Sequence, residues 1–154
     1  MEDLIPFERL IDHGLEAVMP AHVIYEKIDP LPAGFSPFWL QKVLRERFSF
    51  QGVIFSDDLN MAAAQAGGDY RERARAALEA GCDMALVCNN REAAIEVLDE
   101  LRDYRELASQ ARLVRMHGRK ALNSNKLHMD IRWRKAVQMA ADAQLQHASP
   151  ALDL

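Results

Sequence analysis

Three short apolar segments, each preceded by a glycine, constrain the fold of this 154-residue chain more than any other feature. The segments are 15–19, 53–55 and 84–88, and the glycines are Gly14, Gly52 and Gly81. Apolar residues mostly follow one another in these segments, which is typical of strands covered by protein on both faces. Glycine before each strand favours the left-handed backbone in which a helix ends and the chain turns into a strand.

The segments between these strands have the features of helices. Ser36 and Pro37 are a typical helix start, because serine caps free backbone N–H groups and proline fits the first turn. Further helices are expected at 6–12, 38–48, 70–80, 107–114 and 133–145, and after Asn90, where the buried face would carry Ala94, Ile95, Leu98 and Leu101. Strands that alternate with helices indicate a parallel sheet and an α/β fold. The pattern does not say whether the sheet is open or part of a barrel.

Strand-like segments stop at about Asp103. We therefore expect residues 1–103 to form the strand–helix units and residues 104–154 to form a helical extension that packs on them. The sequence is 49% hydrophobic and 27% charged, as in an ordinary soluble domain. No apolar run approaches the ~18 residues that span a bilayer, and the first residues lack the regions of a secretory signal. We expect a cytoplasmic protein that makes no contact with membranes.

Charge and cysteine content narrow the classes of ligand. The net charge of −4 argues against general nucleic-acid binding. The segment 112–135 holds eight Lys or Arg residues against one acid, and we interpret it as the solvated faces of terminal helices. Cys82 and Cys88 resemble small buried hydrophobic residues and predict neither a disulfide scaffold nor a zinc site. We expect no metal and no cofactor.

Polar residues follow each predicted strand, at the sheet edge where parallel α/β proteins bind ligands. His22 follows the first strand, Asp57 and Asp58 the second, and Asn89 the third. Any fold of this class would bring such residues together, so helix caps and solvated loop residues are an alternative interpretation. His22 could bind substrate or orient a carboxylate, or it could be a hydrogen-bonded loop residue.

Asp57 and Asp58 are the sharpest of these features. Neighbouring strand residues point to opposite faces, so the two carboxylates are not expected to act together on one substrate atom. One could be a nucleophile while the other holds backbone; alternatively, both are caps or solvated acids. A receiver-like signalling domain with Asp57 as phosphate acceptor would need an acidic pair after an earlier strand and a lysine after a later one. Neither is found at the corresponding strand ends.

Five ordered segments resemble the bacterial β-N-acetylhexosaminidases of glycoside hydrolase family 3. They are 3–7, 17–25, 32–36, 52–61 (Gly52-Val-Ile-Phe-Ser-Asp-Asp-Leu-Asn-Met61) and 80–89 (Ala80-Gly-Cys-Asp-Met-Ala-Leu-Val-Cys-Asn89). The resemblance implies the C-terminal part of a (β/α)8 barrel, with the three strands as the last three of that barrel. It also implies that Asp57 is the nucleophile in a retaining hydrolysis of terminal β-linked N-acetylglucosamine from muropeptides during peptidoglycan recycling. His22, Asp58 and Asn89 would bind the substrate or support the site.

The family also carries two features that nothing in this chain matches. One is a sugar-binding segment of the type Lys-His-Phe-Pro-Gly-His-Gly, and the other is an Asp–His pair that serves as acid and base. Loss of a general acid typically costs ~10²–10⁴-fold in rate, and three strands leave a parallel edge unpaired. We therefore expect the chain alone to be weakly active or inactive, with a missing N-terminal half as a candidate partner. The alternative is a non-catalytic half-barrel that binds a sugar or a protein.

Overall fold

The computed structural model describes residues 2–118 and 124–147, which belong to two compact units. The first unit, Met1–His117, contains the sheet and all the predicted site residues. The second unit, Gly118–Leu154, contains α5 (Ser124–Met129) and α6 (Ile131–His147). Helix α4 (Leu107–Val114), which we expected in the helical extension, belongs to the first unit. The packing of an extension on the barrel stays a prediction.

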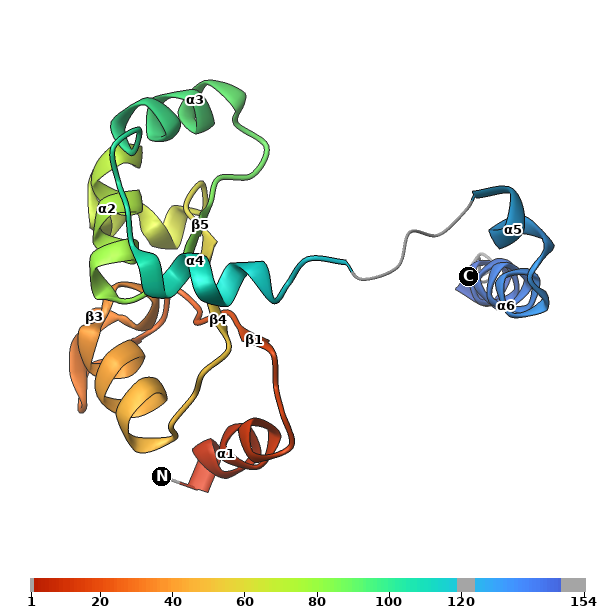
Figure 1. The fold of residues 1–154 in the computed structure, drawn as a ribbon, viewed down its shortest axis with the longest axis horizontal. Helices are drawn as coiled ribbons and strands as arrows, with labels where there is room; N and C mark the ends of the chain where they lie inside the picture. The colour runs from red at the N-terminus through yellow and green to blue at the C-terminus, as the bar shows by residue number, and fades with distance from the viewer. Residues whose placement is uncertain (1, 119–123, 148–154) are drawn as a thin grey trace, which may run out of the picture. The chain divides into compact units, whose positions relative to one another are not determined.

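A parallel three-stranded sheet forms the centre of the first unit (Figure 1). Its strands are β1 (Ala17–Val18), β4 (Val53–Asp58) and β5 (Met84–Leu86), in the order β1-β4-β5. The pairs Ala17–Val53 and Val18–Ile54 join β1 to β4, and the pairs Phe55–Met84 and Asp58–Leu86 join β4 to β5. The predicted α/β class, with three parallel strands, is confirmed.

The predicted helices next to these strands are present. Helix α1 (Ile5–Asp12) precedes β1, the π-helix η3 (Phe38–Arg47) lies between β1 and β4, α2 (Tyr70–Ala80) lies between β4 and β5, and α3 (Arg91–Glu100) follows β5. Short 3-10 turns η1 (Glu2–Leu4), η2 (Ala33–Phe35) and η4 (Ala62–Gly67), and an antiparallel pair of β2 (Ile24–Tyr25) and β3 (Asp29–Pro32), complete the unit. The sequence did not predict the β2–β3 pair. Within the described ranges, no helix is both long and apolar enough to cross a bilayer.

The hydrophobic core lies where η3, β4 and α2 meet, and α3 contributes to it through Val97. Helix α3 lies beside α2 (Figure 1), with Ala93 and Val97 buried. The predicted buried face of α3 is wrong for Ile95 and Leu98, which are 48% and 72% exposed. The reason is that α3 packs on its neighbour through a different helical stripe, so these two apolar side chains remain uncovered in this unit.

The glycines before the three strands have two different roles. Gly14 and Gly81 have φ values of 88° and 124°, the predicted left-handed backbone. The same prediction is wrong for Gly52, because Ser49 takes the left-handed position after η3, with φ of 51°. A Cβ on Gly52 would instead lie 2.4 Å from the backbone oxygen of Glu16. Gly52 therefore allows β1 and β4 to approach each other closely.

Replacing Gly52 by alanine is expected to lower the free energy of unfolding by about 1–3 kcal/mol, the usual cost of overpacking. The new methyl group cannot be accommodated easily, because Glu16 oxygen accepts the 2.9 Å hydrogen bond of Val53 N–H. Urea denaturation followed by circular dichroism measures this loss. Gly118→Ala is the matched control, since no atom lies within 4 Å of a Cβ built there. Equal stability of the two variants would contradict the prediction.

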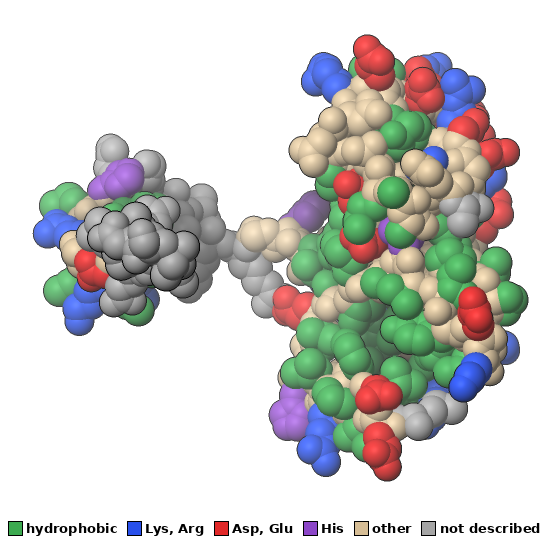
Figure 2. All heavy atoms as spheres, turned by 180° about the vertical axis from the view of Figure 1, so that it is seen from behind, with side chains coloured by type: hydrophobic (Ala, Val, Ile, Leu, Met, Phe, Trp, Pro, Cys, Tyr) green, Lys and Arg blue, Asp and Glu red, His purple; other side chains and the backbone are tan. Residues whose placement is uncertain are grey.

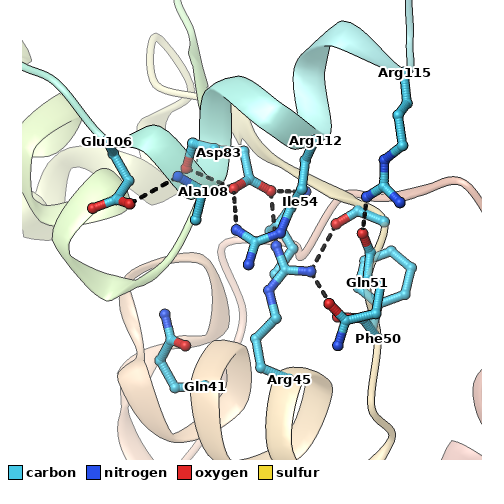
Figure 3. Close-up of polar contacts among 12 residues, drawn as sticks. Gln41, Arg45, Phe50, Gln51, Ile54, Asp83, Glu106, Ala108, Arg112 and Arg115 are labelled. Carbon is cyan, nitrogen blue, oxygen red and sulfur yellow. Dashed lines mark hydrogen bonds and ion pairs between the residues drawn. The ribbon is translucent and has the colours of Figure 1, made fainter.

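A buried carboxylate joins α4 and η3 to the start of β5 (Figure 3). Asp83 Oδ2 accepts hydrogen bonds from Arg45 Nη2 and Ile54 N, each at 2.8 Å. Its Oδ1 accepts from Ser109 Oγ at 2.7 Å and from Arg112 Nη1 at 2.8 Å. The interpretation of Arg112 as part of a solvated helix face is therefore wrong. Arg119 and Lys120 of the same basic stretch lie outside the described residues.

Candidate active site

Asp57 and Asp58 end β4, at the carboxyl edge of the parallel sheet. The pairing with β5 advances three residues on β4, from Phe55 to Asp58, while it advances two on β5, from Met84 to Leu86. β4 therefore holds one extra residue here, as in a β-bulge. Bulges interrupt simple alternation and often re-aim side chains beside active sites. Strand alternation alone therefore does not determine which way the Asp57 and Asp58 side chains point, whereas their hydrogen bonds do distinguish them.

Asp58 is used to hold backbone. Its Oδ1 accepts hydrogen bonds from the backbone N–H groups of Asn60 and Cys88, both at 2.9 Å. Two residues earlier, the fully buried Ser56 accepts a 2.8 Å hydrogen bond from Leu86 N through Oγ. Side chains of β4 thus accept hydrogen bonds from the last residue of β5 and from the segment that follows it. These contacts fix the relative position of the two strand ends, which is the role that the sequence allowed for one of the two acids.

The Asp57 side chain accepts fewer hydrogen bonds than that of Asp58. Its carboxylate is half-buried, and Oδ1 accepts a 2.8 Å hydrogen bond from the backbone N–H of Asp58. Within the described part of the chain it forms no ion pair. A nucleophilic carboxylate needs a polar setting and an oxygen that is not already committed to a cation. Asp57 meets both conditions, whereas Asp58 is committed to the backbone.

Cys88 lies close to both aspartates. Its thiol is exposed, so the interpretation of Cys88 as a small buried residue is wrong, although it holds for Cys82. Burial raises the pKa of Cys82 to about 12. Desolvation and then the negative charges of Asp58 and Asp57 raise the pKa of Cys88. The Cys88 thiol therefore stays protonated at neutral pH, beside the candidate nucleophile.

A polar network fixes the segment that follows the aspartates. Tyr70 Oη donates to Asn60 Oδ1 at 2.6 Å and accepts from Asn90 Nδ2 at 3.2 Å. Arg73, which is buried, donates to the backbone oxygens of Leu59 and Gly68 at 2.8 and 2.6 Å. Its guanidinium lies 4.9 Å from the centre of the Tyr70 ring. The network joins the loop after β4 to α2 and to the cap of α3, where Asn90 Oδ1 accepts from Ala93 N.

The structure gives the positions of His22 and Asn89 but does not link either residue to Asp57. His22 is 8% exposed and packs on Phe35, with ring centres 5.0 Å apart. Both of its ring nitrogens are buried without a hydrogen-bond partner in the described structure, so the interpretation as a hydrogen-bonded loop residue is wrong. Asn89 is exposed and has a left-handed backbone, with φ of 59°. No hydrogen bond or ion pair among described residues joins either side chain to Asp57, and their roles stay predictions.

Comparison with known proteins gives a consistent result. The profile of the glycosyl hydrolase family 3 N terminal domain matches residues 1–117. A protein named beta-hexosaminidase from Thioalkalivibrio sulfidiphilus is 58% identical over 134 residues, which are 87% of this chain and 39% of that protein. Native NagZ from Neisseria gonorrhoeae has a TM-score of 0.70 at 38% identity, covering 96% of this chain and 41% of that one.

A second Neisseria gonorrhoeae structure, NagZ in complex with N-trifluoroacetyl-D-glucosamine, has a TM-score of 0.70 at 39% identity. It covers 91% of this chain and 40% of its own. The chain therefore spans about two fifths of the length of this relative and of each of these two NagZ chains. The family profile covers most of the chain, and both the parallel sheet and the sequence agree with it. This chain belongs to glycosyl hydrolase family 3.

Proposed function

We propose that this chain provides the nucleophile in the retaining hydrolysis of terminal β-linked N-acetylglucosamine. The observation that carries the proposal is Asp57, a half-buried carboxylate at the carboxyl edge of the sheet that forms no ion pair with any described residue. Relatives named beta-hexosaminidase, and a NagZ structure that holds N-trifluoroacetyl-D-glucosamine, support this sugar class. Muropeptides released during peptidoglycan recycling are the proposed substrates. Family membership leaves no support for the receiver-like interpretation.

The proposed reaction is a double displacement. The Asp57 carboxylate attacks the anomeric carbon, the bond to the leaving-group oxygen breaks, and a covalent glycosyl ester forms. An activated water then cleaves the ester and releases the sugar with retained configuration. Asp58 holds the end of β5 through Cys88 N–H, and Tyr70 holds Asn60, so that the carboxylate is presented in a fixed position.

The general acid of this reaction has to be a residue other than those at the end of β4. Retaining enzymes place the two carboxyl groups about 5–5.5 Å apart, with the acid at the leaving-group oxygen. Asp58 is poorly suited to this role, because its Oδ1 already accepts two backbone N–H groups. The acid and the residues that grip the sugar are therefore proposed to belong to parts of the family chain beyond these 154 residues.

The chain alone is expected to hydrolyse a chromogenic β-N-acetylglucosaminide at least about 10²-fold more slowly than a full-length relative, as loss of a general acid predicts. The comparison requires purified 154-residue chain and the Thioalkalivibrio sulfidiphilus relative under the same conditions. Equal kcat/KM values for the two proteins would contradict this assignment of the missing acid.

A fusion tests the proposed function directly. The part of the Thioalkalivibrio sulfidiphilus protein that lies outside the matched segment, called the complement below, is joined to residues 1–154. We expect the fusion to hydrolyse the chromogenic substrate, and NMR to show the β-anomer of N-acetylglucosamine as the first product. A folded fusion that releases the α-anomer first, or that does not turn over the substrate, would overturn the proposal. The unaltered relative serves as the positive control.

A cytoplasmic location is part of the same proposal. Both cysteines of the chain, Cys82 and Cys88, are free, and Cys88 is exposed. An exposed free thiol is better preserved in a reducing compartment than in an oxidising one. Fractionation of cells followed by detection of the intact chain would test the location.

A further inference from the structure

We infer that Arg73 is a positioning residue for the candidate nucleophile. Its guanidinium joins the two ends of the loop that follows β4, and this loop determines how Asp57 is held. The loop comprises residues 59–68 and includes η4 (Ala62–Gly67), and we refer to it as the 59–68 loop. The inference deepens the proposed function and rests on it, because Arg73 acts on the reaction only through Asp57 and has no assigned contact with the substrate.

Helix α2 carries three arginines, which lie on two different sides of the helix. Arg71 and Arg75 are four residues apart and therefore share one side, where they form ion pairs with Glu96 and Glu100 of α3. Figure 2 shows such acidic and basic side chains next to one another over the end of the first unit that α2 and α3 form. Arg73 lies on the other side of the helix and is only 9% exposed.

The buried guanidinium of Arg73 holds both ends of the 59–68 loop. Its Nη1 donates a 2.8 Å hydrogen bond to the backbone oxygen of Leu59, and its Nε donates a 2.6 Å hydrogen bond to that of Gly68. A planar guanidinium presents several donors in fixed directions, whereas the ammonium group of lysine is a single point of charge. Arg73 can therefore fix the first and the last residue of the loop relative to each other.

Leu59 transmits this constraint to the end of β4. It is fully buried and follows Asp57 by two residues. The Leu59 N–H donates a 2.8 Å hydrogen bond to the backbone oxygen of Leu86 at the end of β5, while its C=O accepts from Arg73. Both backbone polar groups of Leu59 are thus held. Asp57 is followed closely by backbone whose direction Arg73 helps to set.

The absence of a carboxylate partner shows why an arginine is needed here. Within the described ranges Arg73 forms no ion pair. Burying a cation without a carboxylate is costly, and a neutral donor such as glutamine would cost less if a single hydrogen bond were sufficient. Arg73 therefore serves the geometry of two backbone carbonyls rather than a charge pair.

Hydrogen exchange in the 154-residue chain tests this contact without requiring activity. The backbone N–H groups of Leu59, Met61 and Gly68 all donate hydrogen bonds. Arg73→Lys is expected to raise their exchange rates at least about tenfold, because lysine cannot hold both ends of the loop and local opening becomes easier. Arg75→Lys is the matched control on the same helix, where the side chain is 50% exposed, and should leave the three rates unchanged. Equal rates in the two variants would overturn the inference.

Kinetics of the fusion with the complement test the positioning role itself. Arg73→Lys is expected to lower kcat about 10²-fold with KM nearly unchanged, because a small displacement of the nucleophile slows its attack without weakening the binding of the sugar. Arg75→Lys should keep the kcat of the parent fusion. Arg73→Gln, which can reach only one of the two carbonyls, should give the same pattern if the lysine variant does not fold. A folded Arg73 variant with the kcat of the parent would overturn the positioning role.

The two measurements separate this inference from the proposed function. An active parent fusion whose Arg73→Lys variant keeps its kcat would support the reaction and overturn the positioning role alone. A parent fusion that is folded but inactive would count against the proposed reaction and would remove the positioning role with it. In that case the exchange rates still show whether Arg73 holds the 59–68 loop.

Discussion

In the fusion with the complement, Asp57→Ala lowers kcat/KM by about 10⁴- to 10⁶-fold, as expected when a nucleophile is removed. Alanine cannot form the glycosyl ester, and the neighbouring Asp58 is poorly suited to replace the nucleophile, since its Oδ1 accepts hydrogen bonds from two backbone N–H groups. The melting temperature should change little, because Asp57 makes a single local hydrogen bond. Steady-state kinetics with the chromogenic substrate measure the loss.

Azide distinguishes a lost nucleophile from a damaged site. A small anion can occupy the space left by the Asp57 carboxylate and attack the anomeric carbon from the same side, which gives an α-glycosyl azide. We expect azide to restore turnover of Asp57→Ala and NMR to show this product. Asp58→Ala is the control: it should lower stability by freeing Asn60 and Cys88 N–H groups, and azide should not rescue it. Rescue of Asp58→Ala alone would reverse the two roles.

Local patterns in the sequence account for most of the fold. Helix α2 begins and ends at the predicted residues because Asp69 caps it with a capping box and Gly81 ends it in a left-handed conformation. The exposed stripe of α3 and the role of Gly52 could not be predicted in this way. Both depend on contacts with segments distant in the sequence, namely α2 in one case and Glu16 in the other.

The position of the candidate site could be predicted from the sequence, but not which role each of its residues has. Strand ends brought Asp57, Asp58 and Asn89 to one sheet edge, and the resemblance gave Asp57 its expected role. The bulge in β4 and the contact of Asp58 with Cys88 N–H carry no local signal, because they arise from the pairing with β5. Tyr70 and Arg73 were missed for the same reason, since their partners lie across the loop that follows β4.

Asp83→Ala is expected to lower the free energy of unfolding by about 3–5 kcal/mol, the usual cost of removing one partner from a buried ion pair. The Asp83 side chain is fully buried, and those of Arg45 and Arg112 are 10% and 23% exposed. Burial lowers the pKa of Arg45, and the charge of Asp83 opposes this effect. Without Asp83, the Arg45 cation keeps only neutral acceptors, the backbone oxygens of Phe50 and Gly52. Urea denaturation of the 154-residue chain measures the loss.

Because of where the Asp83 cluster lies in the sheet, a second measurement distinguishes Asp83→Ala from Asp57→Ala. Asp83 precedes β5, so it lies at the amino end of the sheet, where residues of parallel α/β barrels serve stability, while Asp57 lies at the carboxyl end. In the fusion, Asp83→Ala should therefore lower the melting temperature yet keep kcat at temperatures where it stays folded, the opposite of Asp57→Ala. Asp99→Ala removes a carboxylate from an exposed pair with Arg102 and should change neither quantity. A lower kcat for folded Asp83→Ala would show that the cluster takes part in catalysis, because a loss of stability alone does not lower the kcat of the folded protein.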